Sequence, residues 1–100
     1  MAVDTGGTFR ILHVDDDASL LEITSAFLTR EDERFTVLGA TSGEAGLERL
    51  DEDIDCVISD YDMPDMHGID FLEAVRAEWP DLPFILFTGK GSEAVASEAI

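Results

Sequence analysis

Short apolar segments alternate with segments of helical periodicity throughout this sequence, and that alternation constrains its fold more than any other feature. Between the apolar segments, hydrophobic residues recur three and four positions apart, which is typical of amphipathic helices. Strands that alternate with helices predict βαβ units, and therefore an α/β fold built on a parallel sheet with right-handed crossovers. The predicted strands are Phe9–Val14, Phe35–Ala40, a segment that begins at Cys56 and ends at Asp60, and Leu82–Thr88.

The segments between these strands carry the start and stop signals of helices. Thr41 and Glu44 fit a capping box that opens the second helix. Pro80 closes the third helix, because the residue before a proline avoids the α region. A last helix is predicted over Ser92–Ile100, with its first residue as the cap. In the first helix, which begins at Ala18, one face carries Leu20, Ile23 and Phe27, with Leu21, Thr24 and Leu28 beside it.

The third predicted strand delivers a carboxylate to the point where the strand must end. Pro64 and Gly68 stop regular structure shortly after Asp60. Asp60 is therefore expected at the carboxyl end of a central strand, where open α/β sheets bind their ligands. An aspartate in that place is a candidate nucleophile or metal ligand. Aspartates also end strands as simple turn formers, so this stretch alone leaves both interpretations open.

Other polar side chains follow the first and fourth predicted strands. Asp15 and Asp16 come after the first strand, and Thr88 ends the fourth. Because the carboxyl ends of parallel strands lie along one edge of a sheet, these residues are expected to converge with Asp60. Carboxylates that lie so close together cannot all ionise at low cost without a cation. Mg²⁺ prefers oxygen ligands of this kind. The combination indicates phosphoryl chemistry, in which an aspartate attacks in line and Thr88 hydrogen-bonds a phosphoryl oxygen.

These motifs together identify a family resemblance. From Phe9 to the last residue the chain resembles the receiver domain of two-component response regulators, of the chemotaxis-receiver type. The resemblance implies a flavodoxin-like, doubly wound parallel sheet of strand order 2-1-3-4-5, preceded here by a loose tail over residues 1–8. The motifs that carry it are Val14-Asp15-Asp16, the run from Ile58 through Asp60 to Pro64 with Gly68, and Phe87-Thr88-Gly89.

The resemblance also implies a role for each matching residue. Asp60 would be the phosphoacceptor, taking its phosphoryl group from a sensor histidine kinase or a phosphotransfer protein and losing it by hydrolysis. The implied cofactor is Mg²⁺, bound directly by Asp16 and Asp60, largely through water by Asp15, and by the backbone carbonyl of Asp62. The family is a signalling one, so no enzymatic turnover is expected beyond self-phosphorylation and self-dephosphorylation. Thr88 would be the switch hydroxyl, with Gly89 as the small residue that leaves it access.

The chain departs from the family pattern at its end. Family members continue through a fifth strand and a fifth helix, so the chain is expected to be truncated before them, with strand order 2-1-3-4. The lysine that ends the fifth strand is then absent, and Lys90, two residues after Thr88, does not take its place. The fourth strand would be an exposed apolar edge through which copies of the chain associate.

The charge balance bears on partners and compartment. Six basic residues against 23 acidic ones give a net charge of −17 and a pI near 4.1. Such a surface argues against binding of nucleic acid or of an anionic membrane by this segment. It favours a salt-adapted, halophilic host, because concentrated salt screens the self-repulsion. No apolar stretch approaches the roughly 20 residues of a membrane span and no signal peptide is evident, so a cytoplasmic location is expected.

Two alternatives from other classes remain open. One is an interaction module that keeps the receiver fold but works without phosphorylation. The other is a Mg²⁺-dependent aspartyl-phosphate phosphatase, because Asp60-Tyr61-Asp62 matches the Asp-x-Asp pattern of those enzymes. In such phosphatases the motif follows the first strand and a threonine comes two residues later, whereas position 64 here is proline.

Overall fold

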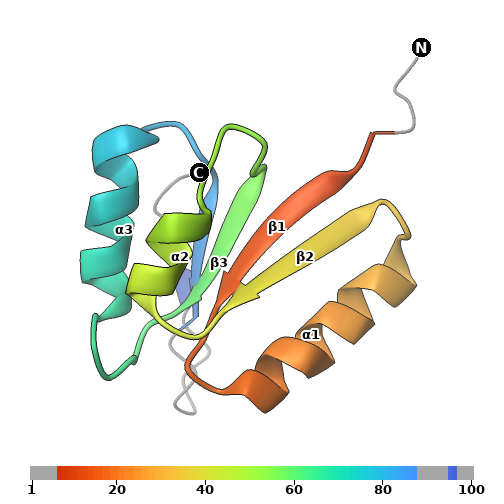
Figure 1. Ribbon diagram of the computed structural model, residues 1–100, viewed down its shortest axis with the longest axis horizontal. Helices are drawn as coiled ribbons and strands as arrows, with labels where there is room; N and C mark the ends of the chain where they lie inside the picture. The colour runs from red at the N-terminus through yellow and green to blue at the C-terminus, as the bar shows by residue number, and fades with distance from the viewer. Residues whose placement is uncertain (1–6, 88–94, 97–100) are drawn as a thin grey trace.

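The computed structural model describes residues 7–87 and the pair Val95–Ala96. Its sheet has the order β2-β1-β3-β4-β5, and the first four of these strands run parallel, which confirms the predicted order 2-1-3-4 (Figure 1). The strands are β1 (Phe9–Val14), β2 (Phe35–Ala40), β3 (Cys56–Asp60), β4 (Phe84–Phe87) and β5 (Val95–Ala96), and the helices are α1 (Ala18–Glu31), α2 (Gly43–Arg49) and α3 (Gly68–Glu78).

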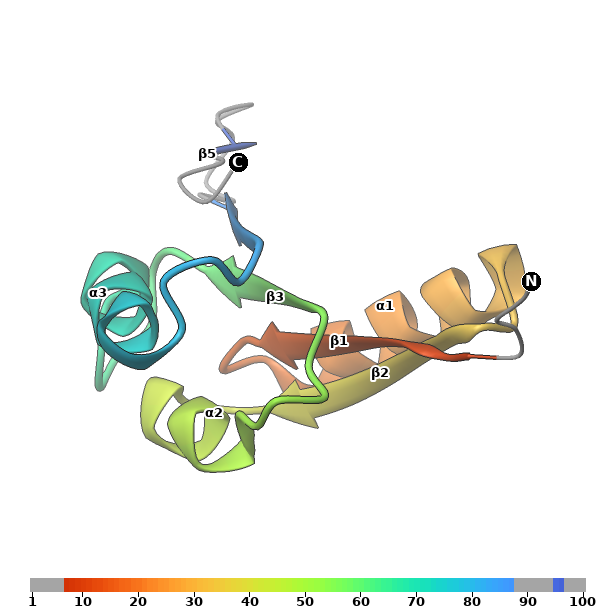
Figure 2. The same ribbon diagram turned by 90° about the horizontal axis from the view of Figure 1, so that it is seen from above.

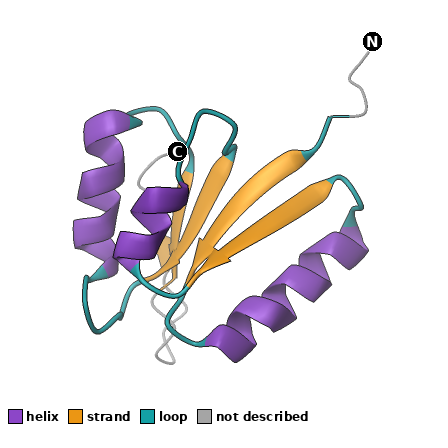
Figure 3. Ribbon diagram, in the orientation of Figure 1, coloured by secondary structure: helices purple, strands orange, loops and turns teal. Residues whose placement is uncertain are grey.

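Helices cover both faces of the sheet, as a doubly wound fold requires. α1 lies on one side of the sheet, next to β2, whereas α2 and α3 lie on the other (Figure 2). The view coloured by secondary structure shows each helix in the connection between two parallel strands (Figure 3). Because every crossover returns the chain to the same edge, the carboxyl ends of β1 and β3 lie side by side.

The main core lies between the sheet and the α2–α3 pair. Alternate strand residues point to this face, and the α3 residue Phe71 packs its ring 5.6 Å from that of Phe84 on β4. α2 approaches closely at Gly46, where a β-carbon would sit 2.9 Å from a methyl group of Val14. The other strand residues of this core are Leu12, Ala40, Val57 and Leu86, and α3 adds Leu72 and Val75.

The face covered by α1 is packed less completely. No side chain of this fully described helix is buried. Leu21 contacts the sheet, since it lies over Gly39 of β2. The neighbouring apolar face predicted from the sequence points to solvent instead, and its members are 42%, 65% and 58% exposed at Leu20, Ile23 and Phe27. Two adjacent apolar stripes share this helix, and sequence periodicity cannot tell which of them meets the sheet.

The chain after β4 differs from its prediction. Val95–Ala96 form β5, antiparallel to Leu86–Phe87, so the predicted helix over Ser92–Ile100 is wrong at that pair. The predicted free edge of β4 is wrong at the same place, because β5 pairs with it there. An extended strand leaves its outward N–H and C=O groups unpaired, and a second extended segment satisfies them where a helix would not. The remaining residues of the predicted helix lie outside the described part of the chain.

The start of α2 also differs by one residue. Ser42, not Thr41, is the N-cap, and its hydroxyl accepts a hydrogen bond from the Ala45 N–H at 3.0 Å. Glu44 therefore lies one position too early to close the predicted capping box. None of the helices in the described part of the chain has the length and apolarity needed to cross a membrane.

Candidate functional site

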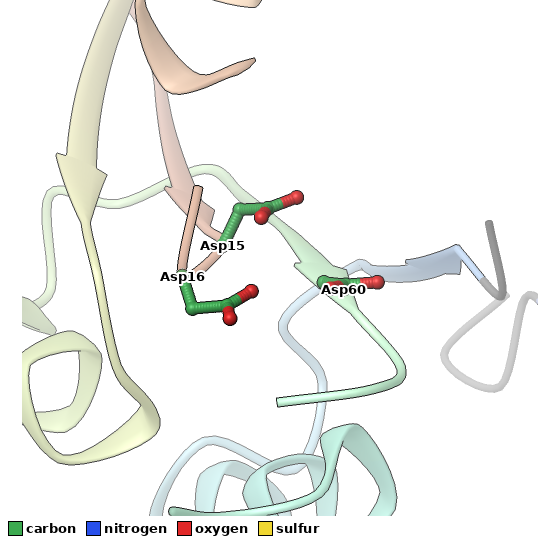
Figure 4. A group of neighbouring side chains, drawn as sticks. All are labelled: Asp15, Asp16 and Asp60. Atoms are coloured by element: carbon green, nitrogen blue, oxygen red, sulfur yellow. The ribbon is translucent and has the colours of Figure 1, made fainter. Parts of the chain in front are cut away.

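Three carboxylates meet at the carboxyl edge of the sheet. β1 and β3 are neighbours, so Asp15 and Asp16, which follow β1, come next to Asp60, the last residue of β3. One carboxylate oxygen from each residue lies within 4.8 Å of the other two, and the three side chains occupy the same region (Figure 4). Asp15 is buried, Asp60 is half-buried and Asp16 is exposed. The predicted convergence of these three residues is confirmed.

The loop after β1 gives its three aspartates different structural tasks. One oxygen of Asp15 accepts the Asp17 N–H at 2.9 Å and so closes a tight turn. Asp17 is the N-cap of α1, since its carboxylate accepts hydrogen bonds from the Ser19 and Leu20 N–H groups at 3.0 and 3.3 Å. Together these three bonds fix where α1 begins and restrain the backbone on either side of Asp16. The capping role was missed in the sequence, although an aspartate before a predicted helix is its usual signal.

The electrostatics of the cluster favour a bound cation. Burial raises the pKa of Asp15, the hydrogen bond from Asp17 opposes that rise, and the charge of Asp60 adds to it. Burial also raises the pKa of Asp60, against hydrogen bonds from the backbone of Asp62 and Tyr61, and the charge of Asp16 raises it further. Both carboxyl groups therefore ionise less readily than free aspartates. A hard divalent cation would relieve their repulsion, and an all-oxygen cluster fits Mg²⁺ better than softer metals.

The loop from Asp60 to Gly68 is held at both ends. The Tyr61 N–H donates to the Phe87 carbonyl at 2.6 Å, and the Gly68 N–H donates to the Tyr61 carbonyl at 2.8 Å. Met63 anchors the middle of the loop, since it is only 3% exposed. The loop leads directly into α3, whose N-cap is His67. The acidic edge of β3 is thus tied to both β4 and α3.

The remaining predicted site residues fall into two groups. Asp62 lies in the loop, exposed, two residues beyond Asp60. Thr88 and Gly89 lie outside the described residues, as does Lys90. Phe87, which directly precedes Thr88 in sequence, is paired in register with Asp60. One further residue at this edge was not singled out from the sequence: Ser59, a fully buried hydroxyl next to Asp60. A serine within an otherwise apolar strand was the available signal.

Comparison with known proteins gives consistent matches. The family model of the response regulator receiver domain matches residues 11–100. The transcriptional regulatory protein CpxR of Escherichia coli K12 is 42% identical over 84 residues, which are 84% of this chain and 35% of CpxR. The response regulator SaeR of Staphylococcus aureus USA300 is 32% identical over 83 residues, which are 83% of this chain and 36% of SaeR. The chain therefore spans about a third of the length of these curated relatives.

Solved structures of similar fold agree. A CheY-like receiver domain protein from Methanospirillum hungatei superposes with a TM-score of 0.77 at 31% identity, over 87% of this chain and 69% of that protein. The response regulator TrrA from Thermotoga maritima, in complex with Mg²⁺ and BeF, gives a TM-score of 0.73 at 30% identity, over 79% of this chain and 68% of TrrA.

Proposed function

The chain belongs to the response regulator receiver domain family, and from this membership we propose that Asp60 accepts a phosphoryl group in a two-component phosphorelay. One observation carries the proposal: three carboxylates from neighbouring strands lie within 4.8 Å of one another at the sheet edge. Among them, Asp60 combines a strand-end position with partial exposure. Asp15, by contrast, is buried.

The chemistry would be a single phosphoryl transfer. A carboxylate oxygen of Asp60 attacks the phosphorus atom, and a new P–O bond forms. The bond from phosphorus to the leaving group breaks, and the leaving group keeps the electron pair. With a phosphohistidine donor, the released imidazole nitrogen is the leaving group. With acetyl phosphate, it is acetate. The product is an acyl phosphate on Asp60, which later returns to the carboxylate when water attacks the phosphorus and inorganic phosphate departs.

The residues present suit a Mg²⁺ ion. Asp16 and Asp60 would bind it directly, Asp15 largely through water, and the Asp62 backbone carbonyl would complete the protein ligands. When bound, such an ion neutralises charge on the phosphoryl oxygens. The raised pKa values of Asp15 and Asp60 support this assignment, since burial, and to a smaller extent the neighbouring carboxylates, disfavour their ionised forms when no cation is bound. The Mg²⁺ and BeF complex of TrrA supports it by analogy.

Switching and partners follow from the family. We assign the switch hydroxyl to Thr88 and the neighbouring small position to Gly89, because Thr88 follows the register partner of Asp60 in sequence. The phosphoryl donor would be a sensor histidine kinase or a phosphotransfer protein. The chain would act as a signalling phosphoacceptor rather than as an enzyme with turnover, and its cytoplasmic location stays a prediction.

Intact mass spectrometry tests the proposal. The chain is incubated with acetyl phosphate and Mg²⁺ at high salt, beside Asp60→Asn and the control Asp65→Asn, which removes an exposed carboxylate of the same loop. We expect one added phosphoryl group on the wild type and on Asp65→Asn, and none on Asp60→Asn. A wild type that gains no phosphoryl group would favour the phosphorylation-independent interaction module. Continuous release of phosphate from phosphate esters would favour the phosphatase.

A further inference from the structure

Ser59 is a polar residue in an apolar place. It is 0% exposed, and its register partners on the neighbouring strands are the buried residues Val14 and Leu86. A hydroxyl in such surroundings is unfavourable unless it makes a hydrogen bond. Its Oγ atom donates one to the carbonyl oxygen of Asp60 at 3.0 Å. The buried hydroxyl is therefore directed at the backbone of the proposed phosphoacceptor.

The peptide group between Asp60 and Tyr61 is held at both ends. Its carbonyl oxygen accepts the Ser59 hydroxyl, and its N–H donates to the Phe87 carbonyl at 2.6 Å. Gly68 also lies against it, since a β-carbon there would approach the Asp60 carbonyl oxygen to 2.6 Å. This peptide is the one through which the chain leaves β3. The Tyr61 backbone in this peptide also hydrogen-bonds the Asp60 carboxylate, so the orientation of the peptide affects where that carboxylate lies relative to Asp15 and Asp16.

We propose that Ser59 is a positioning residue for phosphoryl transfer, whose buried hydroxyl fixes the Asp60–Tyr61 peptide and with it the approach of the Asp60 carboxylate to the phosphorus atom. The inference rests on the proposed function of Asp60. Without the hydroxyl, the carbonyl loses this partner and the peptide can tilt. An in-line attack is sensitive to such small displacements of the nucleophile. Ser59 itself would touch neither the donor nor the metal.

The test compares Ser59→Ala with two matched variants of the 100-residue chain. Ser59→Thr keeps the hydroxyl, and Val57→Ala disturbs the same face of the same strand without removing a hydrogen bond to Asp60. Phosphorylation by acetyl phosphate is followed by intact mass at saturating donor and Mg²⁺. The temperature is one at which circular dichroism shows each variant to be folded. The donor concentration at half-maximal rate is measured as well.

We expect the maximal rate of Ser59→Ala to fall about tenfold, with little change in the half-saturating donor concentration. Ser59→Thr should recover most of the rate, and Val57→Ala should stay within about twofold of the wild type although it is less stable. If Ser59→Ala does not fold, Ser59→Cys replaces it, because a thiol is a weaker donor and should also lower the rate.

Two results would overturn the inference alone. One is a hydroxyl-lacking variant that reacts at the wild-type rate, and the other is an equal loss of rate in Val57→Ala. A wild type that is not phosphorylated at all would overturn the proposed function together with this inference, so the two failures are distinguishable.

Discussion

A β-carbon at Gly68 would lie 2.6 Å from the carbonyl oxygen of Asp60 and 2.8 Å from the Cα of Tyr61. No atom pair of this kind tolerates so short a distance, so the first residue of α3 must be glycine for the end of β3 to keep its place. The start of a helix and the orientation of a reactive strand end are thereby linked by steric contact alone.

Gly68→Ala is expected to destabilise the fold by about 1–3 kcal/mol, as overpacking of a close contact usually does. The obstacle is backbone, which cannot rotate away as a side chain does. Urea unfolding measures the change. Gly39→Ala is the control, because its new β-carbon would meet only the Leu21 side chain, at 3.3 Å, and should change stability by less than about 1 kcal/mol. Equal losses in both variants would contradict the steric explanation.

α3 begins without a side-chain cap, so a capping residue at its start should stabilise the folded chain. His67 is the N-cap residue and has extended backbone angles, yet its side chain makes no capping hydrogen bond. Asn supplies an acceptor oxygen without adding charge, so His67→Asn should be more stable than His67→Ala by about 1 kcal/mol in urea unfolding. Both variants lose the contact between the His67 and Tyr61 rings, so their difference isolates the cap. Equal stability of the pair would contradict this expectation.

The raised pKa values of Asp15 and Asp60 predict the sign of a pH effect in the absence of metal. The folded chain holds their protons above the ordinary aspartate pKa of 3.8, where the unfolded chain has released them. Their contribution to stability therefore declines as the pH rises above 3.8 through the raised values. Asp60→Asn removes part of this penalty, so it should be more stable than the wild type at pH 7 and lose that advantage near pH 3. Urea unfolding at both pH values, with a chelator, checks the sign.

The pKa of Asp32 shifts in the opposite direction and supplies a reference for the same measurement. Hydrogen bonds from Arg34 lower it to about 2. Its contribution is present above pH 3.8 and is lost as the pH falls towards 2. Asp32→Asn should therefore flatten the acid limb of the stability profile and leave the limb above pH 3.8 unchanged. A change confined to the higher limb would show that the two effects have been assigned to the wrong groups.

Mg²⁺ should stabilise the chain, because an ion that binds only the folded state adds to its stability with concentration. Asp16→Asn is expected to weaken Mg²⁺ binding by at least about tenfold, since even indirect ligand partners cost that much. Calorimetric titration measures the affinity, with Asp65→Asn as the control for the loss of one nearby negative charge. Wild-type affinity in Asp16→Asn would contradict the assigned ligand set.

The excess of acidic residues predicts a strong response to salt. With 6 basic and 23 acidic residues, most carboxylates have no basic partner, and their repulsion weakens as the Debye length falls from about 10 Å at 0.1 M to about 3 Å at 1 M salt. Thermal unfolding should therefore shift upwards over that range of KCl. A variant with Glu52→Gln and Asp53→Asn, two exposed neighbours before β3, should respond less. A salt-independent unfolding temperature would argue against salt adaptation.

The strands and the acidic cluster were predictable because each depends on a strong local signal combined with a topological rule. The segment from Cys56 to Asp60 is short and begins with apolar, β-prone residues, so it is expected to form a strand. Parallel connectivity then brings Asp60 to the same edge of the sheet as Asp15 and Asp16. Nothing about their meeting required knowledge of distant packing. The first three strands and the parallel order therefore agree with expectation.

The structure differs from the sequence-based prediction where two local conformations have similar energies. Thr41 and Ser42 are both residue types that favour the N-cap position. The backbone conformation of the folded chain places Ser42 there. The two apolar stripes of α1 differ in how they contact β2. The spacing of apolar residues in the sequence does not show which stripe faces the sheet. Val95–Ala96 pair with Leu86–Phe87 of the preceding strand, and this tertiary pairing outweighed the local helix signals.

Asp15, Asp16 and Asp17 form a run of three identical residues, and the structure implies that each would obey a different substitution rule. Position 17 needs only a short acceptor side chain, so Ser, Asn and Thr should serve there. Position 15 needs an acceptor of fixed reach for its turn, which Asn alone retains. At position 16 the negative charge is proposed to bind Mg²⁺, so a carboxylate is needed there. Saturation mutagenesis should therefore find a different set of tolerated residues at each of the three positions, although all three are aspartates.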